Sequence, residues 1–194
     1  MAAVRLQKIK AEYGDKVTIS WKSFPLMTGV LQNREFSAYT AQAWRRADED
    51  EEDIHLKIWD ASVECPASSM PALEAAKCAE LQGKEAFERL HWALFKAHFE
   101  QSKDISEREV LVALAKETGL DAKRFTTELD SSSQRSRILA EYEEAVDKYP
   151  GFGIPTVVVA DRYPIVGAVP LSVYRRIIDR FLGRSASVKE EGGE

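Results

Sequence analysis

The sequence predicts an α/β fold in which a long helical block separates two parts of a small sheet. Three observations lead to this prediction. Residues 17–24 alternate apolar and polar side chains, as a half-buried strand does. Residues 69–149 repeat apolar side chains with a helical period, and residues 156–166 contain two short runs rich in β-branched side chains. The order along the chain is therefore helix, strand, helical block, hairpin and a final helix.

The N-terminal elements are a helix followed by the first predicted strand. Apolar side chains in residues 4–13 have a loose helical period, and Gly14 is suited to end that helix. In the strand Val17–Phe24, the odd positions Val17, Ile19 and Trp21 share one face, and Pro25 ends the run.

The middle of the chain divides into an irregular part and a helical part. Residues 26–68 are predicted to be irregular, with a solvated acidic loop at 48–53. About five helices follow between Ser69 and Tyr149. Ser106–Glu109 has the pattern of a capping box, and Asp121 is a second predicted N-cap.

The C-terminal elements are a tight hairpin and a helix. The runs Thr156–Ala160 and Tyr163–Val166 are separated by Asp161 and Arg162, which predicts a two-residue turn. The last helix carries apolar side chains from Val169 to Phe181 and ends at Gly183. Residues 184–194 cannot bury a core and are predicted to be a disordered tail.

Composition narrows the functional classes. The 194 residues suffice for one domain with a large insertion, and the net charge of −5, spread along the chain, argues against a nucleic-acid-binding protein. No run of apolar residues has the length of a signal peptide or a membrane span, so we expect a cytoplasmic protein without a membrane partner. The two cysteines are then expected to be reduced thiols.

Three stretches carry a resemblance to a known family. They are Val17–Leu26, Ser69–Gly83 and, most specifically, Gly153-Ile-Pro-Thr156 continuing to Gly167. Together they resemble the DsbA-like branch of the thioredoxin superfamily, in particular the FrnE-type thiol-disulfide oxidoreductases, over nearly the whole chain. The resemblance implies a thioredoxin-like domain made of residues 1–30 and 150–183, with an insertion at 31–149 that is helical from about residue 69.

The same resemblance implies a site and a departure from the family pattern. Gly153, Ile154, Pro155 and Thr156 correspond to the loop that binds substrate, with a cis peptide bond before Pro155 and a backbone at Ile154 that pairs with an extended peptide. The family's first strand and its Cys-x-x-Cys precede the segment that Met1 begins. We therefore expect a chain truncated at its N-terminus, with the first strand and the catalytic thiols missing and two sheet edges unpaired.

Other candidate reactive residues are few. Cys65 precedes a proline in a predicted loop and Cys78 lies in an alanine-rich helix, so a redox couple between them is an open alternative to a structural role. His91 and His98 are seven residues apart on one helix, whereas paired metal ligands stand one turn apart, so we predict no metal site.

Three functions follow from this sequence. The first is a thiol-disulfide oxidoreductase or isomerase of FrnE type, acting on protein thiols and disulfides without a cofactor and represented here by a chain without its dithiol. The second is a glutathione-dependent relative, such as a kappa-type transferase or a 2-hydroxychromene-2-carboxylate isomerase. The third is a redox-inactive module that binds an extended peptide or forms a homodimer through its open sheet edges.

Overall fold

The structure is a computed structural model that describes residues 1–26, 35–50, 55–60, 63–149, 151 and 153–184. These residues form two compact units. Unit 1 comprises residues 1–21 together with the segment from residue 148 onward, and unit 2 comprises residues 22–147. The domain boundaries given above, 1–30 with 150–183 and 31–149, stay a prediction. None of the described helices is long and apolar enough to cross a membrane.

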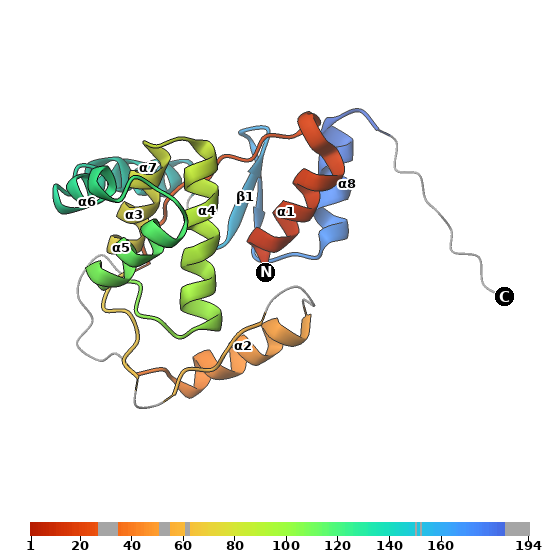
Figure 1. Ribbon diagram of the computed structural model, residues 1–194. Coiled ribbons are helices and arrows are strands. Elements are labelled where there is room, and N and C mark those ends of the chain that lie inside the picture. The colour runs from red at the N-terminus through yellow and green to blue at the C-terminus, as the bar shows by residue number, and fades with distance from the viewer. Residues whose placement is uncertain (27–34, 51–54, 61–62, 150, 152, 185–194) are drawn as a thin grey trace. The chain divides into compact units, whose positions relative to one another are not determined.

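Unit 1 consists of two helices packed on one face of a hairpin (Figure 1). Its elements are α1 (Ala2–Tyr13), a 3-10 turn (Gly14–Lys16), β1 (Thr156–Val159), β2 (Tyr163–Val166) and α8 (Leu171–Phe181). Strands β1 and β2 are antiparallel, with Val157 opposite Ile165. The buried core consists of Leu6, Ile9, Tyr13, Ile165, Tyr174 and Ile178. The core is small, so much of the hairpin remains only half buried.

The predicted end of α1 is confirmed, whereas the predicted hairpin turn is wrong. Gly14 ends α1 with a φ of 57°, as the glycine predicted. The predicted two-residue turn at Asp161 and Arg162 is wrong, because Val159 pairs with Tyr163 across a three-residue loop. Ala160 leaves the strand, since both Ala160 and Asp161 adopt positive φ values.

The strand predicted at Val17–Phe24 does not form. Val17 has extended backbone angles, and Val17, Ile19 and Trp21 pack against the unit 1 core as their alternation predicted. However, the only sheet in the described residues is the two-stranded one, so no strand lies beside this segment to hydrogen-bond with it. An alternating pattern reports which face is buried, whereas a strand also needs a partner.

Unit 2 is helical. Its elements are α2 (Ala38–Asp50), α3 (Met70–Glu80), α4 (Lys84–Phe95), a π-helical turn (Lys96–Glu100), α5 (Arg108–Glu117), α6 (Ala122–Asp130) and α7 (Arg135–Lys148). The five α-helices expected after Ser69 are confirmed. Apolar side chains of α3 to α7 form most of the core, among them Ala75, Cys78, Ala79, Leu90, Leu111, Leu114, Phe125 and Ile138.

Helix α2 was not predicted, because residues 26–68 were expected to be irregular. Ser37 begins this helix, since its hydroxyl accepts a hydrogen bond from the Thr40 N–H at 3.0 Å. Trp44 contacts the Phe99 ring at 4.9 Å between centroids. The predicted acidic loop at 48–53 is corrected at its start, where Asp48–Asp50 belong to α2, and the rest of it lies outside the described residues, as does the predicted tail after Arg184.

The capping box predicted at Ser106–Glu109 is also wrong, whereas the Asp121 cap is confirmed. Helix α5 begins at Arg108 without a side-chain cap. Asp104 accepts hydrogen bonds from both the N–H and the hydroxyl of Ser106, so the serine is committed to the preceding loop. Asp121 accepts from the Arg124 N–H at 3.0 Å and begins α6 as predicted.

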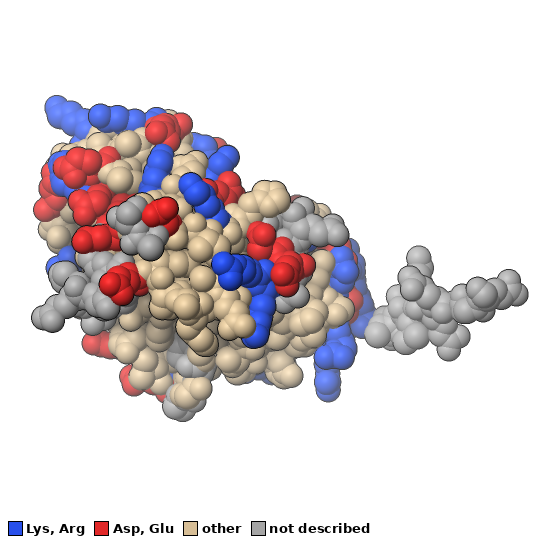
Figure 2. All heavy atoms as spheres, turned by 90° about the horizontal axis from the view of Figure 1, so that it is seen from below, with Lys and Arg blue, Asp and Glu red and all other residues tan. Residues whose placement is uncertain are grey.

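The two units differ in charge. Residues 1–21 and 148–184 contain ten lysines and arginines against four acidic residues, whereas residues 22–147 contain sixteen against twenty-five. On the face seen in Figure 2, acidic and basic side chains are interspersed, with uncharged residues between them. The net charge of −5 therefore conceals a basic unit 1 and an acidic unit 2.

Candidate functional site

The candidate site is the loop Gly153–Thr156, which leads into β1 of unit 1. The peptide bond between Ile154 and Pro155 is cis. The Thr156 hydroxyl donates a hydrogen bond to the Gly153 carbonyl, which closes the loop on itself. Gly167, directly after β2, donates its N–H to the Pro155 carbonyl at 2.8 Å. Gly167 has a φ of 88°, a conformation that glycine adopts without strain, so this anchor depends on a glycine.

The loop presents both a side chain and backbone groups to solvent. The Ile154 side chain is 43% exposed. Within the described part of the chain, neither the N–H nor the C=O of Ile154 makes a hydrogen bond. Unpaired groups of this kind beside a strand are where an extended peptide can add main-chain hydrogen bonds.

A buried arginine binds the segment after β2, to which the loop is anchored through Gly167. Arg5 is only 8% exposed and lies on the same stripe of α1 as Ile9 and Tyr13. Its Nη1 donates to the carbonyls of Ala168 at 2.7 Å and Val169 at 2.9 Å. Sequence reasoning missed this residue. The available signal was a cation at a position where the helical period calls for an apolar side chain.

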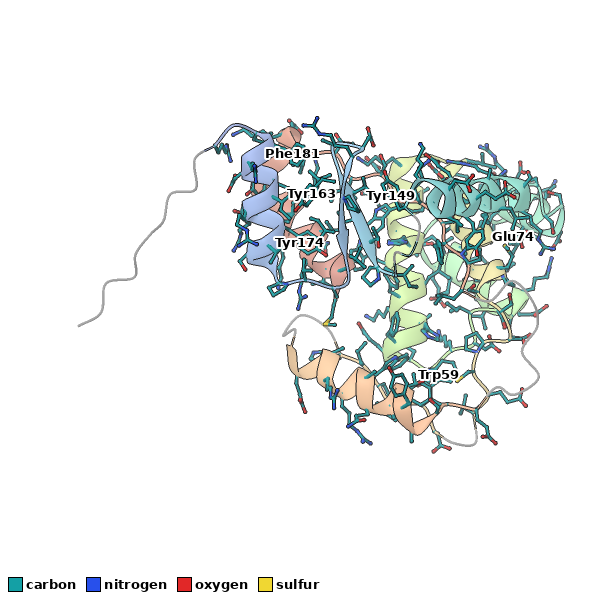
Figure 3. All side chains as sticks on the ribbon, turned by 180° about the vertical axis from the view of Figure 1, so that it is seen from behind. Trp59, Glu74, Tyr149, Tyr163, Tyr174 and Phe181 are labelled. Carbon is teal, nitrogen blue, oxygen red and sulfur yellow. The ribbon has the colours of Figure 1, made fainter. Side chains whose placement is uncertain are left out.

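Tyr174 of α8 also buries a polar group in unit 1. Figure 3 labels it on α8, and it belongs to the core cluster with residues of α1 and β2. Its hydroxyl is buried and has no hydrogen-bond partner among the described residues. Burial raises the pKa of Tyr174, and the charge of Arg5 opposes that rise.

The two cysteines both lie in unit 2, outside this loop. They are not joined by a disulfide: Cys65 is half buried before α3, and Cys78 is buried within α3. Burial, with smaller contributions from Glu128 and Glu74, raises the pKa of Cys78 to about 12. A thiol with such a pKa is almost entirely protonated at neutral pH and is a poor nucleophile.

The histidines of α4 and the π-helical turn lie among aromatic rings. The His91 ring is 4.6 Å from the Phe95 ring, and the His98 ring is 5.3 Å from the Trp59 ring, between centroids. The Trp59 indole N–H donates to the His98 carbonyl at 3.2 Å. Burial lowers the pKa of each histidine to about 4, and Asp104 partly opposes this at His98. In the described ranges no three His, Cys, Asp or Glu side chains are grouped to hold a metal ion.

A hairpin that follows a proline loop and is covered on one face by two helices, with a helical unit inserted in sequence between the first helix and the hairpin, defines a thioredoxin-like protein of the DsbA type. The family model described as the DSBA-like thioredoxin domain matches residues 1–179. The chain belongs to this family.

Solved structures agree on the fold. A probable DsbA oxidoreductase from Streptomyces coelicolor superposes with a TM-score of 0.79 at 22% identity, covering 97% of this chain and 86% of that one. The cytosolic disulfide reductase DsbM from Pseudomonas aeruginosa superposes with a TM-score of 0.65 at 21% identity, covering 94% and 90%. At this level of identity the likeness establishes the fold alone.

Sequence relatives with assigned roles are adapters. The ClpXP adapter protein SpxH of Halalkalibacterium halodurans is 26% identical over 192 residues, and that of Bacillus subtilis is 25% identical over 185. In both cases the match covers 92% of this chain and 61% of the relative, so the chain spans less than two thirds of their length.

Proposed function

We propose that this chain is a DsbA-like protein of the thiol-disulfide oxidoreductase class whose Gly153–Thr156 loop binds an extended segment of a partner protein. The observation that carries the proposal is Ile154, which has an exposed side chain and whose backbone N–H and C=O make no hydrogen bond within the described residues. An extended peptide beside the loop would donate to the Ile154 carbonyl and accept from its N–H. Main-chain pairing of this kind tolerates many partner sequences, which suits a protein that handles thiols in different polypeptides.

Cys78, one of the chain's two cysteines, is poorly suited to the chemical step. A disulfide is attacked by a thiolate, and with a pKa of about 12 Cys78 is a thiolate in fewer than about one molecule in ten thousand at pH 7.5. The sequence contains no Cys-x-x-Cys. We therefore expect binding, rather than disulfide exchange at Cys65 or Cys78, to be the activity of these 194 residues, with protein thiols or disulfides in the cytoplasm as the partners.

An adapter function is the second candidate. The adapters named SpxH are similar to most of this chain, and an adapter needs a protein-binding surface without thiol chemistry. The same loop would serve both functions. They differ in whether the bound partner is also oxidised or reduced.

The binding proposal is tested by an amide NMR titration with reduced, carboxymethylated insulin B chain, in which the thiols are blocked. We expect the Gly153, Ile154 and Thr156 amides to shift, and Ile154→Asp to weaken binding about tenfold, equivalent to about 1.4 kcal/mol. Tyr163→Asp is the matched control, because Tyr163 is 48% exposed at the opposite end of the same hairpin. Shifts that avoid the loop, or equal losses in both variants, would contradict the proposal.

Two further assays separate the functions. Insulin reduction by this chain that Cys65→Ser or Cys78→Ser abolishes would show that the nucleophile is one of these thiols. A titration with glutathione alone addresses the glutathione-dependent alternative. Loop shifts with glutathione and none with the peptide would favour that alternative over a protein partner.

A further inference from the structure

We propose that Arg5 is a positioning residue for the Gly153–Thr156 loop. Its guanidinium holds residues 167–169, and through Gly167 it fixes Pro155. The effect on peptide binding rests on the function proposed above, whereas the effect on loop geometry does not.

The first step is the burial of the guanidinium. A buried charge is costly unless hydrogen bonds compensate it, and the two carbonyls of Ala168 and Val169 supply such bonds to Arg5. These carbonyls lie more than 160 residues away in sequence, just before α8 begins at Leu171. Arg5 therefore joins α1 to the segment that leaves β2, rather than to another residue of its own helix.

The second step connects this segment to the loop. The Val169 N–H donates to the Gly167 carbonyl at 3.0 Å, and the Gly167 N–H donates to the Pro155 carbonyl at 2.8 Å. The three residues 167–169 are thus held by Arg5 on one side and by Pro155 on the other. Gly167 is the residue in this chain of hydrogen bonds that can most easily change its backbone angles, because glycine has no side chain to restrict them. Its φ is already positive.

Without Arg5, the part-buried carbonyls of Ala168 and Val169 would lose these hydrogen bonds, and residues 167–169 would move to recover them. The Gly167 N–H would then no longer be aimed at Pro155. Because Pro155 directly follows Ile154, the unpaired backbone groups of Ile154 would lose the fixed direction that pairing with a peptide needs.

A general loss of helix packing is the competing explanation, and the chain supplies a control for it. Glu12 of α1 and Arg175 of α8 form an ion pair at 2.8 Å, with both side chains almost half exposed. This pair joins α1 to α8 at the surface, and among the described residues its side chains form no hydrogen bond to residues 167–169. Arg175→Met therefore removes an arginine that ties α8 to α1 and leaves the hydrogen bonds of Arg5 to Ala168 and Val169 in place.

The test compares Arg5→Met, Arg5→Lys and Arg175→Met by amide NMR and by affinity for the carboxymethylated B chain. We expect Arg5→Met to shift or broaden the Thr156 and Gly167 amides and to weaken binding about tenfold, and Arg175→Met to do neither. Arg5→Lys keeps the charge but lacks the planar fork, so it is expected to restore binding only in part.

Several results would overturn the inference. Unchanged Thr156 and Gly167 amides in Arg5→Met would do so, as would equal changes throughout α1, α8 and the loop. If Arg5→Met does not fold, Arg5→Lys decides the matter, because selective changes at Thr156 and Gly167 are then expected while Ile9 and Ile178 stay unchanged. If the natural sequence binds no peptide, the proposed function fails, and the amide comparison still tests the positioning role.

Discussion

Units 1 and 2 each bury a cation, but they compensate it in different ways. In unit 1, Arg5 donates to the neutral carbonyls of Ala168 and Val169. In unit 2, Lys77 of α3 donates to the carboxylate of Glu141 on α7 at 2.7 Å. Removing the first cation leaves neutral acceptors, whereas removing the second leaves a buried negative charge. Replacing the buried cation by an apolar side chain should therefore reduce the free energy of unfolding far more in unit 2 than in unit 1.

The buried carboxylate of Glu141 has partners besides Lys77. Its other oxygen accepts from the Ser23 N–H at 2.6 Å, and Arg137 lies 3.7 Å away. Burial alone would raise the pKa of Glu141, but the hydrogen bonds from Lys77 and Ser23 outweigh it, and the pKa is lowered. The ionised carboxylate is thus the form that the folded unit stabilises.

The largest expected effect is that of Lys77→Met. We expect it to reduce the free energy of unfolding of unit 2 by about 3–5 kcal/mol, because Glu141 would keep its charge without its closest cation. Urea unfolding followed by circular dichroism measures this change. The double variant Lys77→Met with Glu141→Leu should recover part of the loss, since both charges are then gone.

The matched control for this prediction is Lys22→Met. Lys22 pairs with Glu144 at 3.3 Å, but both side chains are exposed, so the expected loss is under about 1 kcal/mol. Equal losses in Lys77→Met and Lys22→Met would mean that burial does not distinguish the two pairs, and the comparison between the units would fail.

The next effect in size is a dependence of stability on pH that originates in unit 2. The unfolded chain binds protons at His91 and His98 near pH 6.5, whereas the folded chain binds them only near pH 4. Stability is therefore complete above about pH 6.5 and falls as the pH drops towards 4. The expected loss is about 1 kcal/mol for each histidine between pH 6.5 and 5.5.

Urea unfolding at pH 7.0 and 5.5 tests the histidine prediction. His91→Phe combined with His98→Phe keeps aromatic rings in the cluster and should flatten the loss. His55→Phe changes a histidine outside the cluster and should leave it as it is. If the double variant still loses stability between pH 7.0 and 5.5, titratable groups other than His91 and His98 cause the loss.

Local signals in the sequence were sufficient for part of this fold. Gly14 and Asp121 act within a few residues of their own positions, and both end or begin helices as predicted. Ser106 has an equally clear local pattern, but Asp104 competes for its N–H and hydroxyl. A capping pattern therefore predicts a helix start only where no nearby carboxylate captures the capping residue.

The features that the sequence did not predict depend on contacts between residues far apart in the chain. The alternation at residues 17–24 identified a buried face, but it could not supply a neighbouring strand. The candidate loop Gly153–Thr156 follows from a family resemblance, which a single sequence can carry because these residues are contiguous. Arg5 supports that loop from the other end of the sequence, and Glu141 binds Lys77 across 64 residues. Neither pairing leaves a pattern in a single sequence.

The smallest expected effect returns to unit 1 and has the opposite sign. The Tyr174 hydroxyl is buried without a partner in the described residues, so Tyr174→Phe should stabilise the chain by up to about 1 kcal/mol or leave it unchanged. Tyr13 belongs to the same core cluster, but its hydroxyl is hydrogen-bonded to Asp179, so Tyr13→Phe should destabilise by about 1 kcal/mol. Urea unfolding of the two variants compares them directly. A clear loss in Tyr174→Phe would show that its hydroxyl has a partner after all, and the cost of burying that group would then be compensated in unit 1 as it is for Arg5.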